Sequence, residues 1–123
     1  MAVSHYRELE VWKAGMQLAE RCYRATEGFP KREMFGLTSQ IRRAAASVPA
    51  NVAEGQGREH TKEFLRHVSI ARGSVMEIET HLILANRVGL LPSQELEDLL
   101  TLTDRISRML TGLKKALYRR LNQ

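Results

Sequence analysis

The sequence predicts an all-α fold, an antiparallel up-down-up-down four-helix bundle. Apolar residues recur at spacings of three and four along four long segments, whereas no segment alternates apolar and polar residues in the manner of a strand. Short stretches with glycine or proline separate the segments, and short links between long helices favour antiparallel neighbours. A chain of 123 residues suits one domain. We therefore expect a single domain over residues 1–123, with helices at roughly 8–27, 32–55, 60–88 and 93–120.

The first helix carries two apolar rows side by side. One row, which we assign to the bundle core, consists of Leu9, Trp12, Met16, Ala19, Tyr23 and Thr26. The neighbouring row consists of Val11, Gly15, Leu18, Cys22, Ala25 and Phe29. Together they span about 160° of the helix, more than one seam needs. We favour a subunit interface for the second row, because its small residues would let another backbone come close. The alternative is that this helix lies deep between two neighbours of its own bundle.

An apolar row also runs along the second helix, where it consists of Leu37, Ile41, Ala44, Val48, Asn51 and Gly55. Pro49 has no amide hydrogen and its ring crowds the preceding turn, so we expect a kink or a break there. Asn51 falls on the core row and needs hydrogen-bond partners, for which Ser47 is one candidate. We favour a role for Asn51 in fixing helix register and orientation. The alternative is a ligand-contacting cluster with Glu54 and Arg58.

The third and fourth helices carry the most regular rows. The row of the third helix consists of Phe64, Val68, Ala71, Val75, Ile78, Leu82 and Ala85. The row of the fourth helix consists of Leu96, Leu99, Thr103, Ile106, Leu110, Leu113 and Leu117. Gly89 and Pro92 end the third helix, and Ser93 is the candidate N-cap of the fourth.

The charge is mildly basic and unevenly distributed. The formal net charge is +5 and the pI is about 9.8. The stretch from Arg105 to Gln123 contains several lysines and arginines but no acidic residue. Such a block is compatible with nucleic acid or another acidic partner. The alternative is that cations near a helix C-terminus stabilise the helix dipole and keep the surface soluble.

Composition and local motifs argue against several other classes of protein. Apolar residues make up 43% of the chain and charged residues 27%, as in soluble globular domains. No apolar run approaches the roughly 20 residues of a membrane-spanning helix, and charges near the start argue against a signal peptide. We therefore expect a cytoplasmic protein with no membrane partner. Cys22 is the sole cysteine, so an intramolecular disulfide is excluded.

The sequence carries no catalytic signature, and we expect no enzymatic activity, no cofactor and no metal. The Glu-x-x-His motif of di-iron bundles is absent, as are the zinc-protease and phosphate-binding-loop motifs. Two pairs of residues four apart, Glu63 with His67 and Glu77 with His81, lie on the third helix. We interpret both as local charge or hydrogen-bond pairs rather than as metal ligands.

Three separate stretches carry a family resemblance, namely LEVWKAGMQLAE, FGLTSQIRRAAASVPANVAEGQGR and FLRHVSIARGSVMEIETHLILA. Through them the chain resembles the four-helix-bundle family of proteins encoded in intervening sequences of bacterial 23S ribosomal RNA genes, over almost its whole length. The most diagnostic pieces are the LTSQIRR block at 37–43, the set Pro49, Asn51, Glu54 and Gly55, and Gly73-Ser74 with Glu77, Glu79 and Thr80.

The resemblance implies four helices and, from related members, a ring-like homo-oligomer of five subunits, a homopentamer. It does not imply an enzyme. More distant relatives are accessory proteins of diversity-generating retroelements, in which a basic pentamer binds the reverse transcriptase and nucleic acid. For the branch that this chain resembles, the resemblance implies no particular role. The positions that match the family pattern are Arg42, Arg43, Asn51, Glu54, Arg58, Glu77 and Glu79.

Two functional hypotheses follow. In the first, the protein is an oligomer that binds RNA or DNA, because repetition of cations multiplies the attraction to phosphates. Its phosphate contacts would be Arg42, Arg43, Arg58, Lys114, Lys115, Arg119 and Arg120. Of the tyrosines and the tryptophan, only Tyr6 and Tyr118 lie outside the expected core, so we expect recognition of backbone or shape. In the second hypothesis, the protein is a scaffold for a protein partner and does not bind nucleic acid.

Overall fold

A computed structural model describes residues 5–123 and contains four long α-helices. The long helices are α1 (Glu10–Glu27), α2 (Leu37–Gly57), α3 (Thr61–Arg87) and α4 (Ser93–Leu121). Two one-turn 3-10 helices, η1 (Tyr6–Glu8) and η2 (Lys31–Glu33), precede α1 and α2. Residues 5–123 contain no strand. The predicted all-α class with four helices is confirmed.

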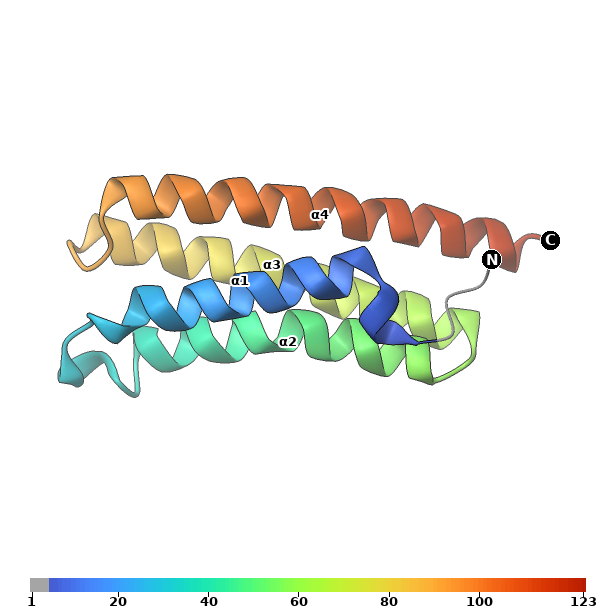
Figure 1. Ribbon diagram of the computed structural model, residues 1–123, viewed down its shortest axis with the longest axis horizontal. Helices are drawn as coiled ribbons and strands as arrows, with labels where there is room; N and C mark the ends of the chain where they lie inside the picture. The colour runs from blue at the N-terminus through green and yellow to red at the C-terminus, as the bar shows by residue number, and fades with distance from the viewer. Residues whose placement is uncertain (1–4) are drawn as a thin grey trace.

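The four helices lie side by side and alternate in direction (Figure 1). α1 packs against α2 and α4, and α3 packs against the same two helices. Each long helix therefore has two neighbours, as in a bundle of square cross-section. The α2–α3 connection and the end of α4 lie at the same end of the bundle (Figure 1).

The second helix begins later than the sequence predicts. Residues Lys31–Glu33 form the separate 3-10 turn η2 rather than the first turn of α2. Gly36 has φ −108° and ψ −117°, outside the helical region, and stands directly before α2. The Glu33 carboxylate accepts a hydrogen bond from the Leu37 backbone amide at 3.2 Å. Glu33 thus satisfies one of the free amides at the start of α2.

Pro49 does not break α2, which remains helical from Leu37 to Gly57. Pro49 is buried, and it faces Gly15 of α1. A Cβ atom added to Gly15 would lie 3.4 Å from three atoms of Pro49. Gly15 therefore lets α1 approach the proline ring closely. Of the predicted kink or break, the break is therefore wrong, since a proline removes one hydrogen bond of a helix without having to end it.

The second row of α1 lies deeper in the bundle than the row that the sequence analysis assigns to the core. Val11, Leu18 and Cys22 are buried in the core, so the row predicted as a subunit interface lies inside the bundle. Of the predicted core row, Met16 and Tyr23 are instead 39% and 45% exposed. The others lie in or against the core, namely Thr26, Leu9, Trp12 and Ala19. The small residues of α1 serve close packing within the subunit, which was the alternative interpretation.

The remaining rows form the core as predicted. The buried hydrophobic residues of the predicted rows of α2, α3 and α4 are Ile41, Ala44, Val48, Val68, Ala71, Val75, Ile78, Leu82, Ala85, Leu99, Ile106, Leu110 and Leu117. Phe64, Leu96 and Leu113 are partly buried against them. This continuous apolar interior holds the four helices together and fixes the positions of their outward side chains.

Candidate nucleic-acid interface

The predicted phosphate contacts lie in separate regions of the bundle. Arg42 and Arg43 lie near the start of α2, while Arg58 directly follows its end. The four contacts predicted near the C-terminus lie in the last turns of α4. Arg58 therefore shares one end of the bundle with the basic end of α4, and Arg42 and Arg43 lie toward the other end (Figure 1).

Arg42 is engaged within the subunit. Its Nε donates to the Thr26 hydroxyl at 2.9 Å, and one terminal nitrogen donates to the Tyr23 carbonyl at 3.3 Å. The guanidinium carbon also lies 4.7 Å from the centroid of the Tyr23 ring, within the range of a cation–π contact. The Tyr23 carbonyl also accepts a hydrogen bond from the Thr26 hydroxyl at 3.1 Å. Arg42 thus ties α2 to the last turns of α1.

Arg43 and Arg58 have different surroundings. Arg43 is exposed, and no ion pair joins it to any residue in the range 5–123. Arg58 lies 3.2 Å from the Glu54 carboxylate, and both side chains are about half exposed, at 54% and 52%. An exposed pair of this kind contributes only about 0.3–0.5 kcal/mol. Arg58 can therefore exchange Glu54 for another anion.

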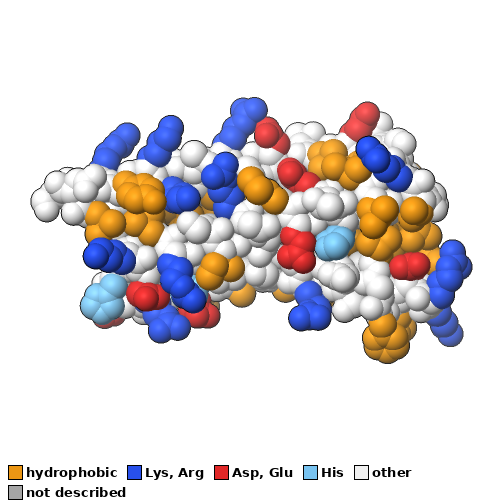
Figure 2. Space-filling model, turned by 180° about the vertical axis from the view of Figure 1, so that it is seen from behind, with side chains coloured by type: hydrophobic (Ala, Val, Ile, Leu, Met, Phe, Trp, Pro, Cys, Tyr) orange, Lys and Arg blue, Asp and Glu red, His pale blue; other side chains and the backbone are white. Residues whose placement is uncertain are grey.

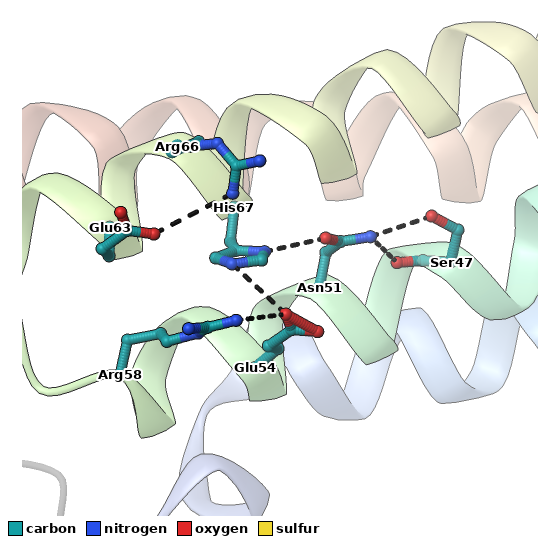
Figure 3. Close-up of polar contacts among 7 residues, drawn as sticks. All are labelled: Ser47, Asn51, Glu54, Arg58, Glu63, Arg66 and His67. Carbon is teal, nitrogen blue, oxygen red and sulfur yellow. Dashed lines mark hydrogen bonds and ion pairs between the residues drawn. The ribbon is translucent and has the colours of Figure 1, made fainter.

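A chain of polar contacts joins α2 to α3 beside Arg58 (Figure 3). The Asn51 amide nitrogen donates to the Ser47 carbonyl and hydroxyl, both at 2.9 Å. The Asn51 oxygen lies 3.0 Å from Nδ1 of His67. Because an amide oxygen only accepts, Nδ1 of His67 carries the hydrogen. Asn51 thus links the two helices at a fixed register, which is the role that the sequence analysis favoured.

His67 has other partners than Glu63, with which the sequence analysis pairs it. Its side chain is 5% exposed, and Nε2 lies 3.4 Å from the Glu54 carboxylate of α2, without hydrogen-bond geometry. The residue four positions before it, Glu63, lies instead 3.9 Å from Arg66 (Figure 3). The predicted Glu63–His67 pair is therefore wrong. His67 faces the neighbouring helix, so spacing along α3 alone does not reveal its partners.

Gly55 explains how α2 and α3 come close enough for these contacts. A Cβ atom at this position would lie 2.7 Å from the His67 Cβ and 3.0 Å from a ring carbon of Phe64. Only a glycine fits at this separation without moving a helix. Pro49, Asn51 and Gly55 thus each have a packing or helix-pairing role within the subunit.

The outer face of α4 carries a row of cations, which we call the α4 basic face. Arg105, Arg108, Lys115 and Arg119 are exposed, and their separations of three, seven and four residues place them on one side of a helix. Figure 2 shows a row of Lys and Arg side chains along the edge formed by the C-terminal half of α4. Arg108 lies 3.0 Å from Asp104. The other three form no ion pair within residues 5–123.

The predicted contacts at the end of α4 include only part of this face. Lys115 and Arg119 belong to it, whereas Lys114 is half-buried beside it and Arg120 lies at the exposed end of the helix. Arg105 and Arg108 lie in the basic stretch from Arg105 to Gln123 but are not among the predicted phosphate contacts. Their spacing from Lys115 is the signal that places them on the same face.

Tyr118 is the aromatic residue nearest to these cations in the sequence, and it is 51% exposed. Tyr6, which the sequence analysis also left outside the core, is partly buried. Its ring packs edge-on against Trp12, with the ring centroids 5.4 Å apart. Tyr118 is therefore the better placed of the two to stack on a base.

Residues 5–123 present neither a candidate metal site nor a candidate membrane-spanning helix. No group of three or more His, Cys, Asp and Glu side chains in this range is arranged to hold a metal ion. The Glu77–His81 pair is a local contact at 3.7 Å. Within the same range, no helix is both long enough and apolar enough to cross a membrane.

Comparisons with known proteins identify a family and a fold. A family model described as 23S rRNA-intervening sequence protein matches residues 7–112. A similar fold occurs in the crystal structure of a protein with unknown function from the S23 ribosomal protein family of Bacteroides thetaiotaomicron. The TM-score is 0.77 at 22% identity, and the match covers 85% of this chain and 98% of that chain. No curated protein matches. The family match ends before Lys114, so the last turns of α4 lie outside it.

Proposed function

The chain belongs to the 23S rRNA-intervening sequence protein family, and we propose that it is a non-enzymatic homo-oligomer that binds RNA or DNA through the α4 basic face. The observation that supports this proposal most directly is the row of Arg105, Arg108, Lys115 and Arg119 on the outside of α4, of which only Arg108 has an ion pair within residues 5–123. Lysines and arginines on one face of a helix are the usual electrostatic footprint of a nucleic-acid interface.

The length of the α4 basic face suits a nucleic-acid backbone. From Arg105 to Arg119 the helix rises about 21 Å at 1.5 Å per residue, which spans several phosphates of a duplex. Arginine can bind a phosphate through two parallel hydrogen bonds. Tyr118 is the single exposed aromatic side chain beside these cations. We therefore propose recognition of backbone and shape, with no strong preference for a base sequence.

Self-association would align several copies of this face. α1 presents Met16 and Tyr23 to solvent, and the neighbouring α2 presents the exposed alanines Ala46 and Ala50. The ten residues of α2 from 44 to 53 carry no charge. An exposed apolar surface of this kind is typical of protein–protein contacts. We call it the α1–α2 apolar face and propose that copies of the chain associate through it.

A second apolar surface, on α3, makes a ring the favoured assembly. Ile70, Leu84 and Val88 are 39%, 45% and 57% exposed on this helix. When the α1–α2 apolar face of one subunit packs against the α3 surface of the next, the contact is heterologous. Repeated contacts of this type form a closed ring when the rotation between subunits closes, and an open filament when it does not. Together with the family resemblance, this supports a ring-like homopentamer.

Charge reversal tests the nucleic-acid part of the proposal. We expect the wild-type protein to retard a structured RNA and a DNA duplex in a native gel, and Lys115→Glu with Arg119→Glu to abolish the retardation. The control variant, Lys31→Glu with Arg32→Glu, reverses two exposed cations of η2 at the other end of the bundle. Equal loss in both variants would show that net charge alone is responsible, and would contradict an assignment to α4.

A protein-interaction scaffold is the second candidate function. It is favoured by Phe35, which is 92% exposed, next to Met34, which is 52% exposed. A large apolar side chain exposed to this extent contributes nothing to the core and is available to a protein partner. If the wild-type protein does not bind nucleic acid even at low salt, this function replaces the first. Binding of a protein partner would then depend on Phe35.

A further inference from the structure

A polar groove opens between α2 and α3, beside the α3 surface through which we propose that the subunits associate. It has a volume of about 260 Å³ and is lined by Gln40, Arg43, Ala44, Ser47, Ser74 and Glu77. Gln40 and Arg43 come from the LTSQIRR block, and Ser74 and Glu77 come from the third diagnostic piece of the family resemblance. Two of the three motif regions thus meet at one place.

The two ionisable residues of the groove have opposite charges but do not pair with each other. Arg43 on α2 has no ion pair with any residue in the range 5–123. Glu77 on α3 lies 3.7 Å from His81, one turn further along its own helix. More than 4 Å therefore separates the charged atoms of Arg43 from the Glu77 carboxylate. A bound molecule can fill this space and contact both groups.

The serine hydroxyls add a hydrogen-bond donor to the groove. Ser47 and Ser74 lie 2.9 Å apart, and one of the two hydroxyls donates to the other. Ser47 also accepts a hydrogen bond from Asn51 at 2.9 Å. Each hydroxyl has one hydrogen, so this contact uses one hydrogen of the pair and leaves the second for another acceptor. A ligand oxygen in the groove would supply that acceptor.

We propose that this groove binds a small zwitterion of amino-acid size, with its carboxylate on Arg43 and its ammonium group on Glu77. A simple anion would leave Glu77 beside it as a like charge, and a simple cation would face Arg43 in the same way. A zwitterion satisfies both side chains and places an oxygen near the serine hydroxyls. The volume equals that of about nine water molecules, below the range of drug-sized ligands.

Titration with zwitterions of increasing length tests this site. Glycine, β-alanine and γ-aminobutyrate place the same two charged groups at increasing separations, while acetate and methylamine supply each charge alone. The readout is the shift of backbone amide signals in a ¹H–¹⁵N spectrum. We expect one zwitterion to cause saturable shifts at Gln40, Ala44 and Ser74. Acetate and methylamine should bind about tenfold more weakly or not at all.

Four variants separate a specific site from general charge effects. Arg43→Gln and Glu77→Gln should each weaken binding about tenfold or more. Arg87→Gln and Glu97→Gln change exposed residues that do not line the groove and should leave binding unchanged. Shifts that do not saturate, or equal affinity for acetate and the best zwitterion, would overturn the proposal. So would binding that survives Glu77→Gln. None of these results depends on whether α4 binds nucleic acid.

Discussion

Single residues set how closely the helices approach one another. Gly15 lies against Pro49, and Gly55 lies against His67 and Phe64. At both positions a larger side chain would push two helices apart and so weaken the packing contacts between them. The polar residues Asn51 and His67 then fix the register at which α2 meets α3. These positions determine the bundle geometry on which the outward side chains depend.

The substitution Gly55→Ala tests the close approach of α2 and α3. The new Cβ would lie 2.7 Å from the His67 Cβ, so we expect a loss of about 1–3 kcal/mol in the free energy of unfolding. Gly73→Ala is the matched control, because a Cβ there meets nothing within 4 Å. In the middle of α3 it should stabilise the protein by up to about 1 kcal/mol. Urea denaturation measures both values, and equal effects would contradict this explanation of Gly55.

The thiol of Cys22 gives a second test at the scale of single residues, namely whether this side chain lies in the core. Burial raises its pKa from the ordinary value of 9.0 to about 12. In the folded protein we therefore expect almost no reaction with a thiol reagent at pH 8, because the reactive form is the thiolate. Full labelling within the mixing time would show that Cys22 is not in the core. Labelling in urea provides the positive control.

The same pKa shift makes stability depend on pH. Between pH 9 and about pH 12 the unfolded chain loses the thiol proton while the folded chain keeps it. The contribution of Cys22 to the free energy of unfolding is therefore complete below pH 9 and falls as the pH rises through this interval. Cys22→Ala should remove this part of the decline. Parallel urea midpoints at pH 8 and pH 10.5 measure the difference.

At the scale of single helices, regular spacing predicted most of the structure. The rows of α3 and α4 became core because each repeats at helical spacing without interruption. In α1 two such rows compete, and the sequence does not show which one its neighbours cover. The structure places the row with Gly15 and Cys22 inside. In α2, the late start reflects the separate turn η2 and the non-helical backbone at Gly36.

The contacts of the candidate site were harder to predict than the helices, because they join residues on different helices. The partners of Arg42 and His67 lie 16 residues away on another helix. Only the packing register brings such residues together, and spacing within one helix carries no information about it. The α4 basic face was more accessible to prediction, because all its members lie on one helix and follow its periodicity.

Replacing Arg42 tests whether this residue joins α1 to α2. Arg42→Met removes the donors to Thr26 and Tyr23 while keeping much of the aliphatic length. We expect the free energy of unfolding to fall by about 1–2 kcal/mol, because two hydrogen bonds between α1 and α2 are lost. Arg24→Met is the control, since its pair with Glu20 is exposed and 3.8 Å long. Equal and small effects of both variants would contradict the role of Arg42 in joining α1 to α2.

At the scale of the whole molecule, opposite sides of the bundle carry different chemistry. The α1–α2 apolar face is uncharged over a long stretch of α2, whereas the C-terminal half of α4 is basic (Figure 2). α4 packs against α1 and α3, not against α2. Assembly through α1 and α2 is therefore compatible with an accessible α4 basic face. In a ring, this face would be repeated once per subunit.

The substitution Met16→Glu tests assembly through the α1–α2 apolar face. Met16 is 39% exposed, so a charge there should leave the subunit folded but oppose contact with another copy. We expect native mass spectrometry to show smaller species, with an unchanged circular dichroism spectrum. Lys13→Glu, on the same helix and exposed, should retain the mass of the wild-type assembly. An unchanged mass in Met16→Glu would place the subunit contact elsewhere.

The central claim is that the α4 basic face binds nucleic-acid phosphates, and the salt dependence of affinity tests it most directly. Fluorescence anisotropy with a labelled RNA hairpin, at a series of salt concentrations, gives the slope of log K against log salt. For the wild-type protein we predict a straight line whose slope counts the neutralised phosphates, at about 0.7–0.9 per contact. Lys115→Glu with Arg119→Glu should bind more weakly and give a shallower line. The same affinity and slope in both proteins would contradict the claim.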